Sequence, residues 1–151
     1  MQPSKNCFDL IKKYEGLNLS AYVDPGSGNL PITIGYGSTM RKDGTHFKLG
    51  DKITLQEAED LLEWEVNKKG ALVLALLPKT TITQNQLDAI TSFAYNVGIG
   101  NLASSTLLKK VKINPNDESI PSEFSRWNKA AGKIMQGLVN RRIAEYTMYK
   151  N

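Results

Sequence analysis

Apolar residues follow a helical pattern at the start of the chain. One face of this segment carries, at three- and four-residue spacing, Cys7, Phe8, Ile11 and Tyr14. Ser4 precedes the face as an expected N-cap, and Gly16 follows it as the kind of residue that ends many helices. The pattern predicts a helix over about residues 4–15.

Glycine and proline interrupt the chain between residues 17 and 52. Ile32–Tyr36 combines β-branched and aromatic residues, which favour strands. Lys42–Thr45 contains Asp-Gly, a sequence typical of a tight hairpin turn. We therefore predict a small β subdomain in this stretch.

Helical periodicity returns at Thr54, which has the spacing of a capping box with Glu57. The apolar face that follows continues to about Leu77, just before Pro78, although Gly70 weakens the pattern in the middle. We expect one long helix here, over about residues 54–77.

A second helical region opens at Thr83–Gln86, and residues 96–100 are predicted to end its first helix. Shorter helices are expected near residues 105–111, 122–127 and 138–149. The whole order is helix, small sheet, long helix and helical bundle, which predicts an α+β fold.

The expected organisation is a single domain, residues 1–151, with two lobes. The small sheet lobe occupies about residues 17–52. The larger helical lobe occupies about residues 78–151 together with the N-terminal helix 4–15, and the helix over about 54–77 connects the two. A cleft is expected between the lobes.

The charge is unevenly distributed in an otherwise ordinary globular composition of 40% hydrophobic and 23% charged residues. Residues 101–151 carry nine Lys or Arg and four Asp or Glu, whereas residues 1–100 carry ten and eleven. A basic C-terminal third indicates an anionic partner: nucleic acid, a membrane surface or an acidic cell-wall polymer. Charge alone does not choose among them.

Several other classes of protein are not indicated. The longest apolar run, Ala71–Leu77, is far shorter than the roughly 20 residues of a membrane span, and the N-terminal residues lack the apolar core of a signal peptide. Cys7 is the only cysteine and is expected to be a buried, inert thiol; His46, the only histidine, is expected at the surface or in a turn. No metal-ligand cluster or phosphate-binding glycine loop is found, so no metal or cofactor is expected.

Glu15 is the first candidate for chemistry. It lies four residues after Ile11, on the apolar face of the first helix, and at the helix C-terminus, where the macrodipole is negative. Both settings disfavour the ionised carboxylate, as a general acid working near neutral pH requires. The alternative is a fraying helix end with Glu15 in water.

Asp24 and Thr33 each have an ordinary interpretation and a functional one. Asp24 followed by Pro25 is favourable turn chemistry, and Thr33 is a common strand residue. In the functional interpretation, Asp24 joins Glu15 as a second carboxylate in an unlike environment, which is the basic equipment of a glycosidase. The Thr33 hydroxyl would then hold a water molecule or a sugar.

The spacing of these residues resembles a known family. Glu15, Asp24 and the Thr-Ile-Gly-Tyr-Gly sequence of residues 33–37 are similar to the catalytic signature of the phage-type lysozymes, the endolysins of glycoside hydrolase family 24. Further similar segments, in the same order, are Phe93–Gly98 with Ser105–Leu108, Trp127–Gly132, and Gly137–Arg142 with Glu145. Eight residues separate Asp24 from Thr33, a longer loop than relatives commonly have, and Ser38 stands where many members have His.

The resemblance implies a lysozyme-like fold and a role for each matching residue. Glu15 would be the general acid, Asp24 the carboxylate that steers water or stabilises positive charge on the sugar, and Thr33 the hydroxyl that positions the water. Arg141 would approach the catalytic glutamate, while Arg142 would pair with a carboxylate such as Glu145. The other implied substrate-binding or supporting residues are Gly35, Tyr36, Ser105, Thr106 and Trp127.

The resemblance also implies a function: a muramidase that hydrolyses the β-1,4 bond between N-acetylmuramic acid and N-acetylglucosamine. Such a phage or prophage endolysin would stay in the host cytoplasm until a holin, which it need not contact, gives it access to the wall. Its partners would be peptidoglycan and anionic wall polymers, with no nucleic acid, no stable membrane insertion and a monomeric state.

Two alternatives remain. A lytic transglycosylase on the same fold needs only the acid, and Asp24 and Thr33 argue against it because both serve a reaction that uses water. A non-catalytic basic module that binds cell wall or nucleic acid would leave Glu15 on an apolar face without a reason.

Overall fold

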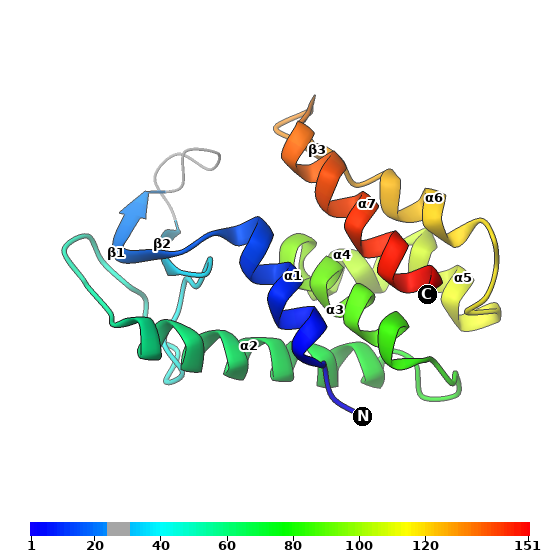
Figure 1. The fold of residues 1–151 in the computed structure, drawn as a ribbon, viewed down its shortest axis with the longest axis horizontal. Coiled ribbons are helices and arrows are strands. Elements are labelled where there is room, and N and C mark those ends of the chain that lie inside the picture. Colours follow the sequence, from blue (N-terminus) through cyan, green and yellow to red (C-terminus); the bar gives the residue numbers. More distant parts are fainter. Residues whose placement is uncertain (24–30) are drawn as a thin grey trace. The chain divides into compact units, whose positions relative to one another are not determined.

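The computed structural model describes residues 1–23 and 31–151. This part of the chain forms seven helices and four short strands (Figure 1). The helices are α1 (Lys5–Glu15), α2 (Leu55–Ala75), α3 (Gln84–Val97), α4 (Ile99–Ser104), α5 (Thr106–Ile113), α6 (Ile120–Ser125) and α7 (Gln136–Lys150). The strands are β1 (Asn18–Val23), β2 (Ile32–Gly35), β3 (Lys129–Ala130) and β4 (Lys133–Ile134). The predicted α+β class is confirmed.

Residue contacts divide the chain into two compact units. The sheet unit is Ile11–Glu65, and the helical unit combines Met1–Leu10 with Val66–Asn151. Both α1 and α2 begin in one unit and end in the other. Among the described helices, none is long and apolar enough to cross a membrane.

The first helix begins and ends where the sequence predicts. The backbone N–H of Asn6 donates to Ser4 Oγ at 3.3 Å, and that of Gly16 donates to the Lys12 carbonyl at 3.0 Å. Gly16 has φ +72°, a left-handed conformation that ends a helix at no steric cost to glycine. The backbone N–H of Ser4 also donates to the buried Asp88 carboxylate at 2.9 Å, which fixes the start of α1 to α3.

Among the described residues of the sheet unit, β1 pairs with β2 in antiparallel fashion, with Tyr22 opposite Thr33. The predicted turn over residues 42–45 is confirmed by an isolated bridge between Met40 and His46. One apolar cluster of this unit contains the buried Ile34, Phe47 and Leu61, with Ala21, Ile32, Ile53 and Trp64 packed around them. Ile11, Ala58 and Leu62 are buried in the same unit as well.

The predicted capping box at the start of α2 is present. The Thr54 N–H donates to Glu57 Oε1 at 3.2 Å, and the Glu57 N–H donates to Thr54 Oγ1 at 3.1 Å. Gly70 has a packing reason that the sequence pattern does not reveal. A Cβ at this position would stand 2.5 Å from Pro3 Cγ, so glycine lets the N-terminal segment lie directly on the helix.

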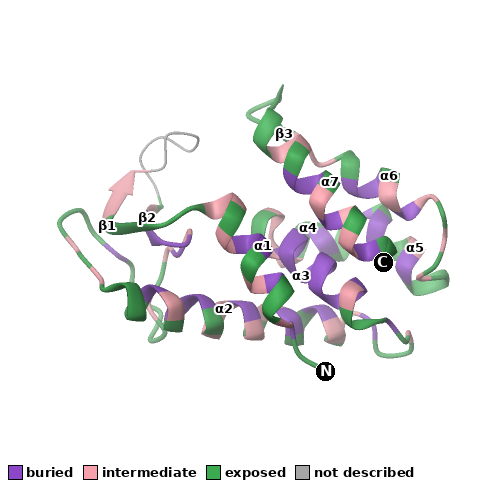
Figure 2. Cartoon of the chain, viewed as in Figure 1, coloured by how far each residue is buried: buried purple, intermediate pink, exposed green. Residues whose placement is uncertain are grey.

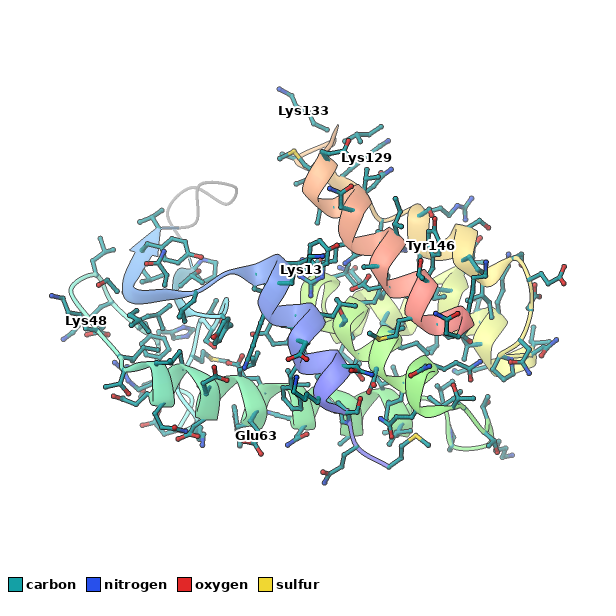
Figure 3. All side chains as sticks on the ribbon, in the orientation of Figure 1. Lys13, Lys48, Glu63, Lys129, Lys133 and Tyr146 are labelled. Carbon is teal, nitrogen blue, oxygen red and sulfur yellow. The ribbon has the colours of Figure 1, made fainter. Side chains whose placement is uncertain are left out.

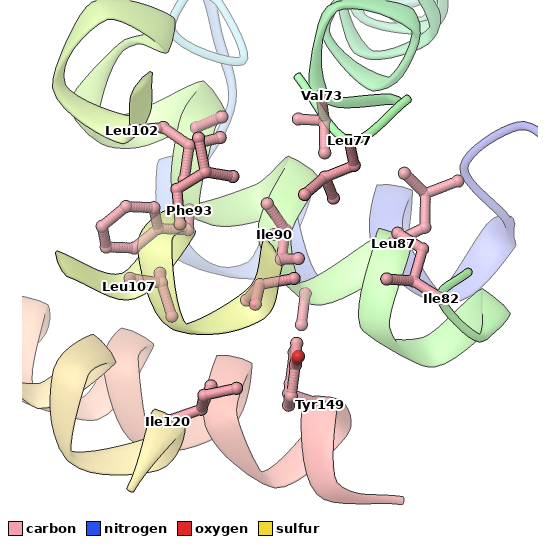
Figure 4. Close-up of a cluster of buried hydrophobic side chains, with 14 of the residues drawn as sticks. Val73, Leu77, Ile82, Leu87, Ile90, Phe93, Leu102, Leu107, Ile120 and Tyr149 are labelled. Carbon is pink, nitrogen blue, oxygen red and sulfur yellow. The ribbon is translucent and has the colours of Figure 1, made fainter. Parts of the chain in front are cut away.

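The helical unit has a large apolar core centred on α3, which is buried along most of its length (Figures 2 and 4). The core contains 15 buried side chains contributed by helices α2 to α7 and the segment before α3. Phe93 is fully buried and meets Phe124 and Trp127 edge to face, each with 5.5 Å between ring centroids. Because α7 packs on both α3 and α6, it closes this core.

Helices α5, α6 and α7 lie within two residues of their predicted limits, but the sequence pattern predicts neither α4 nor the β3–β4 hairpin. Helix α4 starts directly after Gly98, whose φ of +95° ends α3. The hairpin turns at Ala131 (φ +51°) and Gly132 (φ +77°), both in the left-handed region that two-residue hairpin turns use. Alanine gives little sequence signal for that conformation.

Candidate active site

Glu15 is the last residue of α1, and its side chain is half-buried. Its carboxylate lies against the backbone of Gly37, in the turn that follows β2. A Cβ built on Gly37 would stand 2.7 Å from Glu15 Oε2 and 3.2 Å from its Cδ. Any side chain at residue 37 would therefore displace the acid. Glu15 is packed on the turn, not extended into water.

Hydrogen bonds hold the turn under Glu15 closed. The backbone N–H of Ile34 donates to the Ser38 carbonyl at 2.9 Å, and the N–H of Ser38 donates back to Ile34 at 2.8 Å. Gly35 and Gly37 both have positive φ within this turn, +66° and +87°. A Cβ on Gly35 would lie 3.4 Å from Ile53 Cδ1, so this glycine lets the turn pack closely on the core of the sheet unit.

Thr33 is 6% exposed and lies on β2 within the same sheet unit as Glu15. Its hydroxyl donates to the Pro31 carbonyl at 3.2 Å. A hydroxyl has one proton to donate, so while this bond is made Thr33 can only accept a further hydrogen bond. A water molecule held there would donate a hydrogen bond to Thr33 and keep its own lone pairs available.

Polar side chains tie the turn and the end of α1 to α2. The buried Tyr36 hydroxyl donates to Glu59 Oε1 at 3.2 Å, and the Lys12 ammonium forms an ion pair with the same carboxylate. Burial, with a smaller effect of Glu59, raises the pKa of Tyr36, so it stays a donor. Ser38 is buried and donates to Glu65 Oε2 at 3.1 Å.

Asp24, the predicted second carboxylate, lies outside the described residues together with residues 25–30. Its pairing with Glu15 stays a prediction.

Arg141 is buried on α7 in the helical unit. Its Nε lies 3.3 Å from Glu145 Oε2, and one terminal nitrogen donates to the Ser92 carbonyl at 3.1 Å. The predicted partnership of Arg142 with Glu145 is confirmed by an ion pair at 2.7 Å. Two guanidinium groups thus share one carboxylate, whose pKa burial raises against the opposing effect of both arginines. The predicted approach of Arg141 to Glu15 stays a prediction.

Three residues that the sequence assigns to substrate binding come together in the helical unit. Ser105, Thr106 and Trp127 line one groove with a volume of about 450 Å³, together with Ser104, Glu123 and Arg126. The Ser105 hydroxyl is already used in capping α5: it accepts from the Leu108 N–H at 3.0 Å and donates to the Leu102 carbonyl at 2.7 Å. Thr106 is exposed, and Trp127 is half-buried with an edge contact to Phe93.

Sequence reasoning missed the charged residues around the groove and around the turn that Glu15 contacts. Glu123 is buried in the groove, where Lys110 and Arg126 each approach it to 3.4 Å. Lys12 and Glu59 flank the turn near Glu15. Lys12 is far from Glu59 in sequence, and Lys110 is far from Glu123, so no local pattern indicates these ion pairs. Only Glu123 and Arg126 have the three-residue spacing typical of neighbours on a helix.

Cys7 and His46 take no part in these arrangements. Cys7 is a buried free thiol, and burial raises its pKa, with Asp88 and Glu145 adding to the effect. A thiol held protonated is a poor nucleophile, as expected for an inert core residue. His46 is exposed beside the 42–45 turn, where the sequence analysis expects it.

A family model described as phage lysozyme matches residues 12–145. The chain belongs to the phage lysozyme family. Among curated members, the endolysins of Bacillus phages PZA and B103 are 41% and 40% identical to it over 152 and 149 residues. The chain spans about half of their length, 56% and 54%. The endolysin of Acyrthosiphon pisum secondary endosymbiont phage 1 is 37% identical, and the match covers the whole chain and 99% of that protein.

Similar solved structures confirm the lysozyme-like fold. The endolysin from Escherichia coli O157:H7 phage FAHEc1 has a TM-score of 0.86 at 39% identity, covering 99% of this chain and 93% of that one. The muramidase domain of SpmX from Asticaccaulis excentricus has a TM-score of 0.82 at 28% identity, covering 98% and 97%. The predicted resemblance to the phage-type lysozymes is therefore confirmed.

Proposed function

We propose that this member of the phage lysozyme family is a muramidase that hydrolyses the β-1,4 bond between N-acetylmuramic acid and N-acetylglucosamine in peptidoglycan. The observation that carries the proposal is the Glu15 carboxylate packed against Gly37, in the turn of the Thr-Ile-Gly-Tyr-Gly motif. The names of its relatives, endolysins and a muramidase domain, support the same substrate.

In the proposed reaction, Glu15 acts as the general acid. It gives its proton to the glycosidic oxygen while the bond from that oxygen to C1 of the muramic acid residue breaks. Water adds to C1, and the proton that it loses goes to the Asp24 carboxylate. Thr33 holds this water by accepting a hydrogen bond, since its own proton is donated to Pro31.

The helical unit would supply further contacts to the wall. The groove lined by Thr106, Trp127 and Arg126 offers an aromatic ring and an exposed guanidinium to glycan and carboxylate groups. Lys129 and Lys133 project from the β3–β4 hairpin (Figure 3) and are exposed, which suits attraction to anionic wall polymers. As a phage endolysin, the protein would reach the wall of the host after a holin opens the membrane.

The test of Glu15 is clearing of a purified peptidoglycan suspension by Glu15→Gln. Glutamine keeps the size of the side chain but cannot give a proton to the leaving oxygen, so clearing should fall by at least about 100-fold, the lower range for a general acid. Glu63→Gln, at an exposed position of α2, is the matched control and should clear normally. Full clearing by Glu15→Gln would overturn the mechanism.

Water use separates the muramidase from the lytic transglycosylase alternative. Thr33→Val removes the hydroxyl at nearly constant volume, and Asp24→Asn removes the proposed base; both should slow hydrolysis. Mass spectrometry of digested sacculi should find reducing muramic acid ends. Anhydro-muropeptides as the main product would identify a transglycosylase instead.

Attraction to the wall is tested by salt. Replacing Lys129 and Lys133 together by alanine should weaken binding to peptidoglycan that carries anionic polymers at low salt, and the difference should vanish near 1 M salt, where screening is nearly complete. The matched control replaces Lys48 and Lys52, two exposed lysines of the sheet unit. Equal losses from both pairs would show a general charge effect and not a site.

A further inference from the structure

Glu15 lies at the end of a helix, where the hydrogen bonds of the helix itself hold the chain only in part. Glu15 is the last residue of α1, and the chain leaves the helix at Gly16 with a left-handed φ. The final turn of a helix lacks part of its hydrogen bonding and frays easily. A general acid has to keep its position to a fraction of an ångström, so something outside α1 has to hold this turn.

The Glu59 carboxylate on α2 contacts both segments that lie beside Glu15, the end of α1 and the turn after β2. Lys12, three residues before Glu15 on the same side of α1, forms an ion pair with Glu59 Oε2. Tyr36, the residue before Gly37, donates its hydroxyl to Glu59 Oε1 at 3.2 Å. The Lys12 ammonium also lies 5.5 Å from the centre of the Tyr36 ring, which closes the three residues into one cluster.

We propose that Glu59 is a positioning residue for Glu15. Through Lys12 it holds the last turn of α1, and through Tyr36 it holds the backbone on which the Glu15 carboxylate rests. This inference depends on the proposed role of Glu15 as the acid, and it adds a residue that acts through Lys12 and Tyr36.

The exposure of the cluster argues for positioning over stability. The Lys12 and Glu59 side chains are 31% and 32% exposed, and ion pairs with that much access to water add little to the stability of a fold. Removing Glu59 should therefore leave the protein folded but let the end of α1 and the turn move relative to each other. Misplacement of a catalytic group by about 1 Å can cost on the order of 100-fold in rate.

The experiment measures kcat and KM on purified peptidoglycan for Glu59→Ala, Lys12→Met and the double variant, with Glu63→Gln on the same helix as control. We expect kcat to fall about 10- to 100-fold in each single variant, with KM within about 2-fold of the starting protein. The double variant should lose no more than Glu59→Ala alone, because both changes break one cluster. Glu63→Gln should keep both constants.

A charge-reversed pair, Lys12→Glu with Glu59→Lys, separates positioning from general damage. The pair should recover part of the kcat that each single charge reversal loses. If the single reversals damage the structure instead, their losses of kcat should add in the pair. Circular dichroism checks the fold, and Glu59→Gln replaces Glu59→Ala if the alanine variant is unfolded. Wild-type kcat in folded Glu59 variants, or a change in KM alone, would overturn the inference. If Glu15→Gln stays active, the proposed function itself fails; if it is inactive while Glu59→Ala is normal, only the positioning inference fails.

Discussion

The sheet unit and the helical unit of this lysozyme family member are held together in different ways. The helical unit has one cluster of 15 buried apolar residues, while the cluster around Ile34 in the sheet unit has three, and Ile11, Ala58 and Leu62 are buried in that unit outside this cluster. Their charges also differ: the helical unit has 13 basic and six acidic residues, and the sheet unit has six basic and nine acidic. The helical unit therefore combines the larger of the two clusters with a net positive charge.

Polar contacts also join the segments of the sheet unit. Glu59, Ser38 and Asp51 each connect parts of the unit that are distant in sequence. Hydrogen bonds and ion pairs fix geometry more strictly than apolar contacts do, because they depend on direction as well as distance. The comparison indicates that the unit carrying Glu15 is built for position, and that the helical unit supplies most of the stability.

The largest expected effect is loss of the central aromatic ring of the helical unit. Phe93→Ala leaves a cavity where Phe124 and Trp127 met the ring, and should cost about 4 kcal/mol of unfolding free energy. The matched change in the sheet unit, Phe47→Ala, should cost less, about 3 kcal/mol at the low end of the usual range, since the cluster around it has fewer buried members.

Each unit contains one tryptophan, Trp127 in the helical unit and Trp64 in the sheet unit. Urea unfolding followed by fluorescence in Trp64→Phe and Trp127→Phe backgrounds therefore reports the two units separately. Equal losses for Phe93→Ala and Phe47→Ala would break the comparison.

The next effect tests a buried charged group inside the helical unit. Glu145 is fully buried and faces Arg141 and Arg142, and its carboxylate accepts from the Ser92 hydroxyl at 2.6 Å. Glu145→Gln keeps the shape but removes the negative charge that both buried guanidinium groups contact, and should cost about 3 kcal/mol. Urea unfolding with Trp127 as the reporter measures it. A loss below about 1 kcal/mol would mean that water or another group reaches the arginines.

A smaller effect is expected from a single polar contact of the sheet unit. Ser38 is 2% exposed and donates to Glu65, so Ser38→Ala leaves a carboxylate oxygen short of one hydrogen bond. The cost should be about 1 kcal/mol, reported by Trp64. Ser122→Ala, which removes an exposed serine of the helical unit that bonds only within its own turn, is the control and should change little. If Ser38→Ala is as mild as the control, polar contacts do not hold the sheet unit.

The sequence predicts best those features that depend on residues close together in the chain. The capping pair Thr54 and Glu57 and the terminator Gly16 act on residues within one turn, so their signals survive without knowledge of the fold. Glu15 and Thr33 could be chosen because a family motif joins them, and the structure brings both into one unit.

The rest depends on contacts between distant segments. Nothing near Glu59 in the sequence indicates that Lys12 and Tyr36 will meet it. The reason for Gly37 appears only when Glu15 lies beside it, and the reason for Gly70 only when Pro3 does. These are tertiary facts, which periodicity along one segment does not contain.

The smallest effect is a pH dependence confined to the sheet unit. Asp51 accepts hydrogen bonds from the Lys48 N–H and from Arg41, both at 2.9 Å, and these hold the pKa of Asp51 below its usual value. The folded state thus favours the ionised form, and its contribution to stability is present above the unfolded pKa of about 3.9 and lost as the pH falls below it. Asp51→Asn should lower the urea midpoint reported by Trp64 at pH 6 and flatten its decline below about pH 4. The midpoint reported by Trp127 should not respond, because the Asp51 side-chain partners belong to the sheet unit. A parallel response of both tryptophans would mean that the two units unfold as one, and that the sheet unit draws its stability from the helical core after all.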